Sequence, residues 1–249
     1  MRLRGLLKIE PTERESYTFD NQQRYNNLVV NRFDKHFCGE VMGKEPFLQL
    51  HNAILNCQMC AAALPLPPTP ILQVHPSARL LIAGQAPGRK AHHAGRPFDD
   101  PSGDRLRDWL GLNKSDFYDA KQVAIVPMGF CFPGNTFFKS GAKAGQISGD
   151  LPPRPECAAT WHARLLDQLT QIELTIVLGS HAQAYYLNHS GTVTEQVKRW
   201  SYWLEQGKIA LPHPSPRNNR WLKQNPWFEL EVLPILQEKI SRILNSDQA

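Results

Sequence analysis

The sequence predicts a three-layer α/β/α fold, in which a central, mostly parallel sheet of four strands is covered by helices on both faces. Two observations lead to this prediction. Four short apolar runs have the length and composition of strands that are buried on both faces. Segments with helical patterns lie between these runs, and strands that alternate with helices favour a parallel sheet.

The predicted strands span Arg79–Ala83, Val123–Val126, Leu174–Leu178 and Lys208–Leu211. Before the first strand, apolar residues at helical spacing from Glu45 onward predict a helix that leads to two cysteines. The segment Leu64–Pro70 is too rich in proline for a helix or an inner strand, so we expect a connector there.

Further helices are expected after each strand. For the first of them, Ser102 or Asp104 could act as the N-cap. The segment that follows the second strand is rich in glycine, lysine and proline, and we expect a long loop there up to Pro155. The predicted helices span Arg105–Leu112, Glu156–Leu169, Ser180–Leu187 and Pro226–Leu244.

A chain of 249 residues can form one large domain or two small ones. We expect a single domain over residues 45–249. Residues 1–44 are polar and mixed, without a sustained hydrophobic period. Their scattered aromatic side chains indicate an N-terminal extension that packs on the domain rather than a free tail.

The chain is mildly basic, with 28 Lys and Arg against 23 Asp and Glu and a pI near 9.0. This balance suits a polyanionic partner and also an ordinary basic protein. The sequence has no apolar run of roughly 18 residues and no signal peptide, so we expect a cytoplasmic protein without a membrane span. We also expect a monomer, with its five cysteines reduced.

Four cysteines form a pattern typical of a metal site. Cys57 and Cys60 make a C-x-x-C at a helix end, Cys131 follows the second strand, and Cys157 opens a later helix. Four thiolates can hold an iron–sulfur cluster or a zinc ion. Scattered buried cysteines are the alternative. Cys38 lies outside the pattern.

Two loops that leave predicted strands carry the candidate functional residues. GQAPG at Gly84–Gly88 lets the backbone turn sharply and approach a ligand, and HPSPRN at His213–Asn218 follows the last strand. In an open parallel sheet such loops share one edge, where ligands bind. The first loop lacks both the G-x-G-x-x-G spacing and the Walker lysine, which argues against a nucleotide-binding protein.

These motifs, together with GRPF at Gly95–Phe98, resemble the uracil-DNA glycosylase superfamily, and most closely its bacterial and archaeal branch with an iron–sulfur cluster. The similarity runs from about residue 45 to the C-terminus. It implies a monofunctional DNA glycosylase that removes uracil or another deaminated base during base excision repair. It also implies that the four cysteines hold a [4Fe–4S] cluster, with zinc as the alternative.

The resemblance also implies roles for single residues. His213 matches the histidine that donates to the carbonyl oxygen of the leaving base, and Phe98 matches the phenylalanine that stacks on the flipped base. Gln85 and Ala86 would offer backbone groups to the base. Because Ala86 replaces the water-activating Asp of some relatives, we consider Asp99 first, then Asp100 and Asp104, for orienting water. Turn and cap roles are the alternative for these carboxylates.

For DNA binding, Arg217 would wedge into the duplex while Ser215, Asn218 and backbone N–H groups hold phosphates. Lys139, Lys143 and Arg154 could contact the backbone or form a solvated surface.

Pro127 departs from the iron–sulfur relatives, which have at this position an Asn that reads the uracil edge. The base would then be read by backbone groups around Met128, by another side chain, or hardly at all. A binding protein for damaged DNA or uracil, with the same fold and little turnover, is the second functional hypothesis. Residues 132–156 contain no histidine, which argues against the branch that is trapped covalently on DNA.

Overall fold

The computed structural model describes residues 46–188 and 191–245. They belong to one compact unit, which begins at Glu45. The expected packing of residues 1–44 falls outside the described residues, as does Cys38. Among the residues described, none of the helices has the length and apolar character needed to cross a membrane.

The core of the fold is a four-stranded sheet in the order β2-β1-β5-β6, in which every neighbouring pair is parallel. This confirms the predicted α/β class. The strands are β1 (Leu80–Ala83), β2 (Val123–Ile125), β5 (Leu174–Leu178) and β6 (Lys208–Leu211). Nearly every residue in them is buried, as expected for apolar runs covered on both sides.

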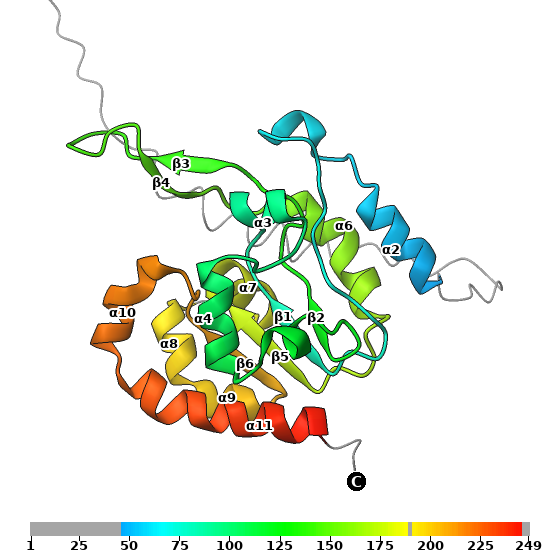
Figure 1. The fold of residues 1–249 in the computed structure, drawn as a ribbon, viewed down its shortest axis with the longest axis vertical. Helices are drawn as coiled ribbons and strands as arrows, with labels where there is room; N and C mark the ends of the chain where they lie inside the picture. Colours follow the sequence, from blue (N-terminus) through cyan, green and yellow to red (C-terminus); the bar gives the residue numbers. More distant parts are fainter. Residues whose placement is uncertain (1–45, 189–190, 246–249) are drawn as a thin grey trace, which may run out of the picture. The chain divides into compact units, whose positions relative to one another are not determined.

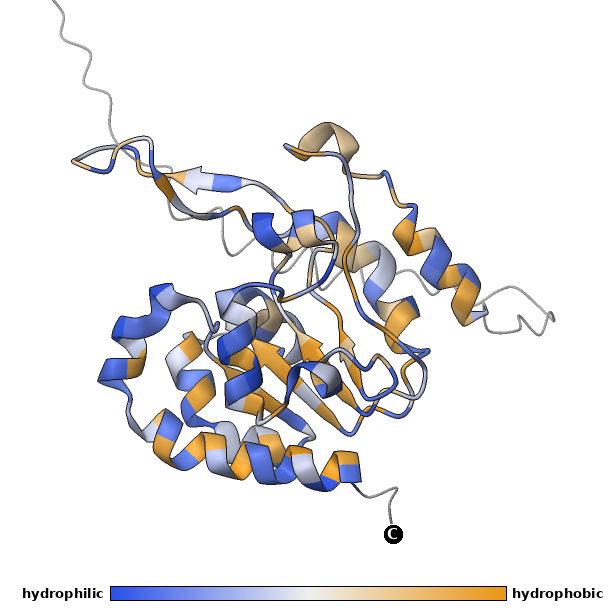
Figure 2. Ribbon diagram, in the orientation of Figure 1, coloured by the Kyte–Doolittle hydropathy of each residue, from blue (hydrophilic) through white to orange (hydrophobic). Residues whose placement is uncertain are grey.

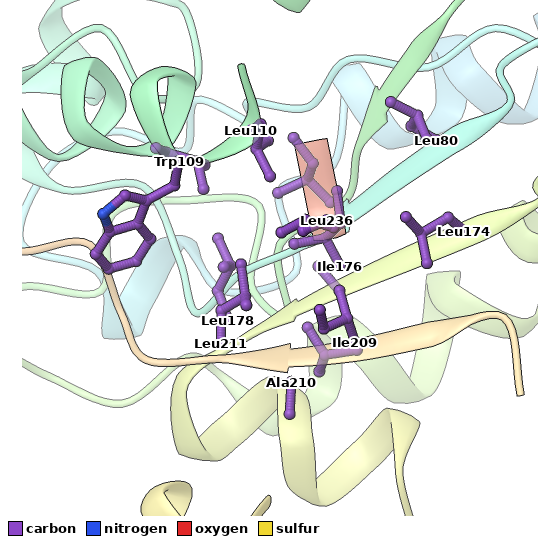
Figure 3. Packing of buried hydrophobic residues seen from close by; sticks show 14 of the residues in the cluster. Leu80, Trp109, Leu110, Leu174, Ile176, Leu178, Ile209, Ala210, Leu211 and Leu236 are labelled. Atoms are coloured by element: carbon purple, nitrogen blue, oxygen red, sulfur yellow. The ribbon is translucent and has the colours of Figure 1, made fainter. Parts of the chain in front are cut away.

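One face of the sheet is covered by α4 (Pro101–Leu110), the π-helical turn η3 (Phe228–Val232) and α11 (Leu233–Asn245). Leu80 and Ile82 pack with Leu110 of α4 and Leu236 of α11. Figure 3 shows Leu178 and Leu211 on the side of Trp109, whereas Ala210 points the other way. The period of two in each strand therefore divides its side chains between two apolar layers.

The opposite face is covered by α2 (Phe47–Leu55), α6 (Pro155–Leu166), α7 (Gly179–Tyr186), α8 (Val193–Lys198) and α9 (Trp200–Glu205). Leu81 of β1 packs here with Ile54 of α2 and Leu165 of α6. In Figure 2 the sheet is mostly hydrophobic, while the surrounding helices alternate between hydrophilic and hydrophobic residues. Each helix thus buries one stripe against the sheet.

Shorter helical segments connect these layers. They are η1 (Ala61–Ala63), α3 (Arg89–Ala94), α5 (Lys114–Phe117), η2 (Pro216–Asn218) and α10 (Asn219–Gln224).

The start of α4 differs from the prediction. Asp100, rather than Ser102 or Asp104, is the N-cap, and its carboxylate accepts from the Gly103 N–H at 2.9 Å. Pro101 explains the shift, because its fixed φ suits the first helical position and it has no N–H to satisfy.

The long loop expected before Pro155 contains an antiparallel hairpin of β3 (Asn135–Phe137) and β4 (Ile147–Asp150). Figure 1 shows it as an arm that extends away from the sheet. Side chains reinforce the pairing, because Ser148 Oγ donates to Thr136 Oγ1 at 3.0 Å and Asn135 Nδ2 donates to Asp150 Oδ1 at 2.7 Å. The prediction of an irregular loop was therefore wrong for these seven residues of paired strand.

Candidate active site

A cavity of about 200 Å³ lies where the chain leaves β1, β2 and β6, at the carboxyl ends of these strands. The two motif loops predicted to meet do meet here. The lining combines Gly84–Gly88 after β1, Pro127 after β2 and His213, Ser215 and Arg217 after β6. A cavity of roughly 150 Å³ is enough to bind benzene in another protein, so this one has room for a ring of nucleobase size.

Phe98 forms one wall of the cavity. A Cβ placed on Gly84 would lie 3.5 Å from Phe98 Cζ, so the ring lies directly over the first motif. The other side of the ring packs edge-to-face on Phe117, with 6.3 Å between centroids. This wall is flat and aromatic, which suits stacking of a planar heterocycle.

The backbone of Phe98 is held in an unusual conformation, with a φ of 54°. Arg107 Nη1 donates to Phe98 O at 3.4 Å, and Tyr118 Oη donates to the neighbouring Pro97 O at 3.0 Å. Gly103 is required, since a Cβ there would lie 1.7 Å from Phe98 O. The position of the ring is therefore fixed by the first turn of α4.

His213 lies at the cavity with its imidazole largely buried. Burial lowers its pKa, against the opposing effects of Asp100 and Asp150, so the ring is neutral near pH 7. The Ser215 N–H donates to His213 Nδ1 at 3.2 Å. With Nδ1 as acceptor, the single ring proton lies on Nε2, which makes Nε2–H the available donor.

The rest of the second motif supports this histidine. Asn218 Nδ2 donates to His213 O at 2.7 Å, so Asn218 positions the loop and does not line the cavity. Arg105 Nη1 from α4 donates to the carbonyl oxygens of Pro214 and Ser215, at 3.3 and 3.2 Å. Arg217 is exposed at the cavity entrance.

A comparison with known families identifies the superfamily of this chain. Residues 72–237, more than half of the chain, match the model of the uracil DNA glycosylase superfamily. The protein belongs to this superfamily. Its members are DNA glycosylases that act in DNA repair, and the matched segment contains both cavity loops together with Phe98.

In this glycosylase-superfamily protein the expected carboxylates separate into two groups. Asp99 does not line the cavity, and it pairs instead with Arg96 at 2.7 Å and Lys114 at 3.5 Å, which hold the pKa of its carboxyl low. Asp104 is exposed and pairs with Arg107. Asp100 does line the cavity, as does Asp150, which the sequence analysis did not single out.

The second strand brings Pro127 to the cavity but not Met128. Met128 is buried in the apolar core, and its N–H donates to Gly84 O at 2.9 Å. The next N–H, that of Gly129, donates to Gln85 O at 3.0 Å. These two N–H groups hold the first motif in place, so they are not free to read a base.

The structure also gives the positions of the remaining residues that were predicted to contact the base or the DNA backbone. Gln85 Nε2 donates to Leu151 O at 3.3 Å, which ties the first motif to the chain after the hairpin. Lys139 and Lys143 are exposed near the hairpin tip, whereas Arg154 Nη2 pairs with Glu156 at 2.8 Å.

The four cysteines predicted as ligands line one small cavity of about 20 Å³ on the other side of Gly129. All four are free thiols. Within 46–188 and 191–245, no three His, Cys, Asp or Glu side chains are already gathered closely enough to hold a metal ion. The donor set nevertheless fits a thiolate-bound centre, because Cys57, Cys60, Cys131 and Cys157 face a common space lined otherwise mainly by apolar residues.

Sequence reasoning did not assign Asp150, Ser102 or Arg105 to the functional site, although all three lie at or beside the cavity. Ser102 and Arg105 lie on α4 close to Phe98, so the position of the helix start was the available signal. Asp150 gave no local signal, since it reaches the cavity only through the hairpin.

Proposed function

We propose that the protein is a monofunctional DNA glycosylase, which hydrolyses the N-glycosidic bond of uracil or another deaminated base in DNA. The observation that carries this proposal is the pairing, in one cavity, of a neutral His213 with a free Nε2–H and the ring of Phe98. Together they provide a donor for an oxygen of the base and a surface for its π face.

The chemistry requires both groups at once. A base inside a duplex cannot be reached, so it must be flipped out, and stacking on Phe98 offsets part of the lost stacking in DNA. Breaking the glycosidic bond leaves a cation-like sugar and an anionic base. The fixed Nε2–H of His213 stabilises that anion, and since the ring starts neutral, it donates a hydrogen bond without adding a full charge to the ground state.

Base selection is the finer part of the proposal. Pro127 offers no side-chain hydrogen bond, and its carbonyl oxygen accepts from His162 Nε2 at 3.0 Å. The N–H groups of Met128 and Gly129 are bonded to the first motif. We therefore propose weaker uracil excision than in relatives that carry Asn here, or a preference shifted to hypoxanthine or xanthine.

A [4Fe–4S] cluster held by Cys57, Cys60, Cys131 and Cys157 is proposed as a structural cofactor, with zinc as the alternative. The support is that all four thiols line one cavity. As a structural cofactor the cluster would hold the chain after β2 in place. This segment contributes Pro127 to the larger cavity and Cys131 to the cysteine cavity. No redox step is needed for hydrolysis.

The second candidate is a binding protein for damaged DNA or uracil that turns over little. It is favoured by the first motif, where Ala86 supplies no carboxylate to activate water, and by Pro127. The two candidates predict the same affinity for a deaminated base in DNA and differ in whether the base is released.

The test is an abasic-site assay with single- and double-stranded oligonucleotides that carry uracil, hypoxanthine, xanthine or normal bases. The glycosylase should release at least one deaminated base and leave strands that break only after alkali treatment. Binding without release would favour the second candidate. Pro127→Asn should increase uracil excision, with Pro127→Ala as its matched control. If wild type excises uracil alone and Pro127→Asn is no faster, the base is read elsewhere.

A further inference from the structure

The cavity needs a group that orients water, and the first motif does not supply one. Hydrolysis requires a water molecule directed at C1′ of the sugar and an acceptor for its proton. Ala86 has no such group. Among the described residues that line the cavity, the carboxylates are Asp100 and Asp150.

Asp100 is already engaged in the fold. Its Oδ1 accepts from the Gly103 N–H at 2.9 Å as the N-cap of α4. Gly103 in turn lies against the backbone of Phe98. Moving or protonating this carboxylate would disturb the helix start that holds the aromatic wall, so Asp100 is suited to a structural role.

Asp150 is placed differently. It is the last residue of β4, directly opposite Asn135 of β3, whose Nδ2 donates to Asp150 Oδ1 at 2.7 Å. The other oxygen, Oδ2, lies 3.7 Å from the point where a Cβ on Gly88 would be, so it is directed at the first motif. One carboxylate oxygen is thus fixed by an amide, and the second faces the cavity loop.

The surroundings of Asp150 suit a base for water. The residue is exposed at the open side of the cavity, where water has access before DNA binds. Arg217 lies nearby, since its Nη1 is 3.0 Å from the Cβ position of Gly149. Asp150 and His213 line the same cavity, and the charge of Asp150 opposes the lowering of the His213 pKa.

We propose that Asp150 is the carboxylate that orients and deprotonates the attacking water, an inference that rests on the proposed glycosylase activity. The C1′–N bond breaks and its electron pair leaves with the base, whose oxygen accepts the hydrogen bond from His213 Nε2–H. Water oxygen bonds to C1′, and its proton passes to Asp150 Oδ2. Asp150 then releases this proton to solvent and the base anion takes up one from solvent, so the products are the free base and an abasic sugar.

This assignment makes the β3–β4 hairpin part of the active site. Asn135 is then a positioning residue, because it holds Asp150 Oδ1 and does not itself line the cavity. Ala86 of the first motif has no carboxylate. The hairpin supplies one to the same cavity through Asp150.

The test measures single-turnover excision of the preferred deaminated base by Asp150→Asn, which keeps the size of the side chain and can still accept from Asn135. The rate should fall about 100- to 10,000-fold, the usual contribution of a general base. The dissociation constant for the same DNA should stay within a few-fold. Asp108→Asn, exposed on α4 away from the cavity, removes the same charge and should excise at the wild-type rate.

Further readouts separate catalysis from structure. Asp150→Glu should recover part of the rate, and Asn135→Ala should lose a smaller part than Asp150→Asn. A purely structural effect would lower the melting temperature of Asp150→Asn, and Asp150→Glu would then fail to recover the rate.

The outcomes distinguish the inference from the proposed function. If wild type excises a base and Asp150→Asn is equally fast, the role of Asp150 is refuted and the glycosylase assignment stands. If Asp99→Asn loses this rate while Asp150→Asn keeps it, the carboxylate role belongs to Asp99. A wild-type protein that releases no base from any of the oligonucleotides overturns both.

Discussion

The two cavities that flank the chain after β2 have opposite characters. The cavity at the motif loops has about 200 Å³, and polar side chains such as His213 and Asp150 line it together with the ring of Phe98. The cavity among the four cysteines has about 20 Å³ and mostly apolar surroundings. The first has room for a ligand that enters and leaves, whereas the second is too small for one.

The comparison shows that one short segment of chain, which follows β2, contributes to the walls of both cavities. Pro127 lines the larger cavity, and Gly129, only two residues later, lines the smaller one. If the roles are separate, changes in the larger cavity should alter excision and leave stability intact. Changes in the smaller one should do the reverse.

Cys157→Ala is the strongest test of that separation. Loss of a ligand to a structural metal centre belongs to the class of changes that cost on the order of 4 kcal/mol of unfolding free energy. We expect anaerobically purified variant to lose most of its iron and to melt at a lower temperature. Full iron content and unchanged melting in each of the four single Cys→Ala variants would refute the four-thiolate centre. Stoichiometric zinc in a colourless wild-type protein would keep the site and change the metal.

His213→Ala should produce the reverse pattern. Removing one fixed donor to a developing anion lowers the chemical step about 100- to 1,000-fold. Single-turnover excision measures this loss, while the melting temperature and DNA affinity should change little. His75→Ala serves as the control, because His75 does not line the cavity and its Nδ1 bonds with Ser77 Oγ. Wild-type turnover by His213→Ala would refute the role assigned to the histidine.

His162 contacts residues of both cavities, and its protonation makes the stability of the fold depend on pH. Its Nε2 donates to Pro127 O at 3.0 Å, while its ring stacks on Phe130, with 5.6 Å between centroids. Burial lowers its pKa from 6.5 to about 4. The unfolded chain therefore binds a proton first as the pH falls, and stability drops from pH 6.5 down to about 4.

The expected loss is on the order of 3 kcal/mol, measured by denaturant unfolding as a function of pH. His162→Gln removes this titration and should flatten the profile over that range. An equal acid loss in wild type and His162→Gln would mean that other groups account for it.

Arg217→Ala should have the smallest effect. One exposed cationic contact to DNA contributes about 1 kcal/mol, so duplex affinity should fall about five- to tenfold. Single strands should be affected less, since the wedge role needs a stacked duplex. Titrations at several salt concentrations check this, with Arg242→Ala on α11 as a charge-matched control. Equal losses for single and double strands would contradict the wedge.

The sheet was predictable because its strands are mainly apolar runs of strand length. Leu174–Leu178 and Lys208–Leu211 were predicted to the residue, and the other two strands within one residue at an end. The motif loops were predictable for a related reason. Loops that leave parallel strands must share an edge, so the meeting of Gly84–Gly88 and His213 follows from the topology alone.

The hairpin was not predictable from its own residues. Its strands read NTF and ISGD, without the apolar alternation that marks a half-buried strand, and the residues between them are polar or glycine-rich. Both strands are instead stabilised by each other and by side-chain pairs such as Asn135 with Asp150. The place of Asp150 in the cavity depends on this tertiary pairing, so no local spacing could reveal it.

The contact between Gly103 and Phe98 has a consequence for how this sequence can vary. With a Cβ position only 1.7 Å from Phe98 O, the first turn of α4 has no space for even one methyl group. Every side chain other than hydrogen would push the aromatic wall out of place or unwind the helix start. In a library of all substitutions, position 103 should therefore tolerate replacement as poorly as His213. Tolerance to substitution alone would then suggest a chemical role for Gly103, although its role is steric.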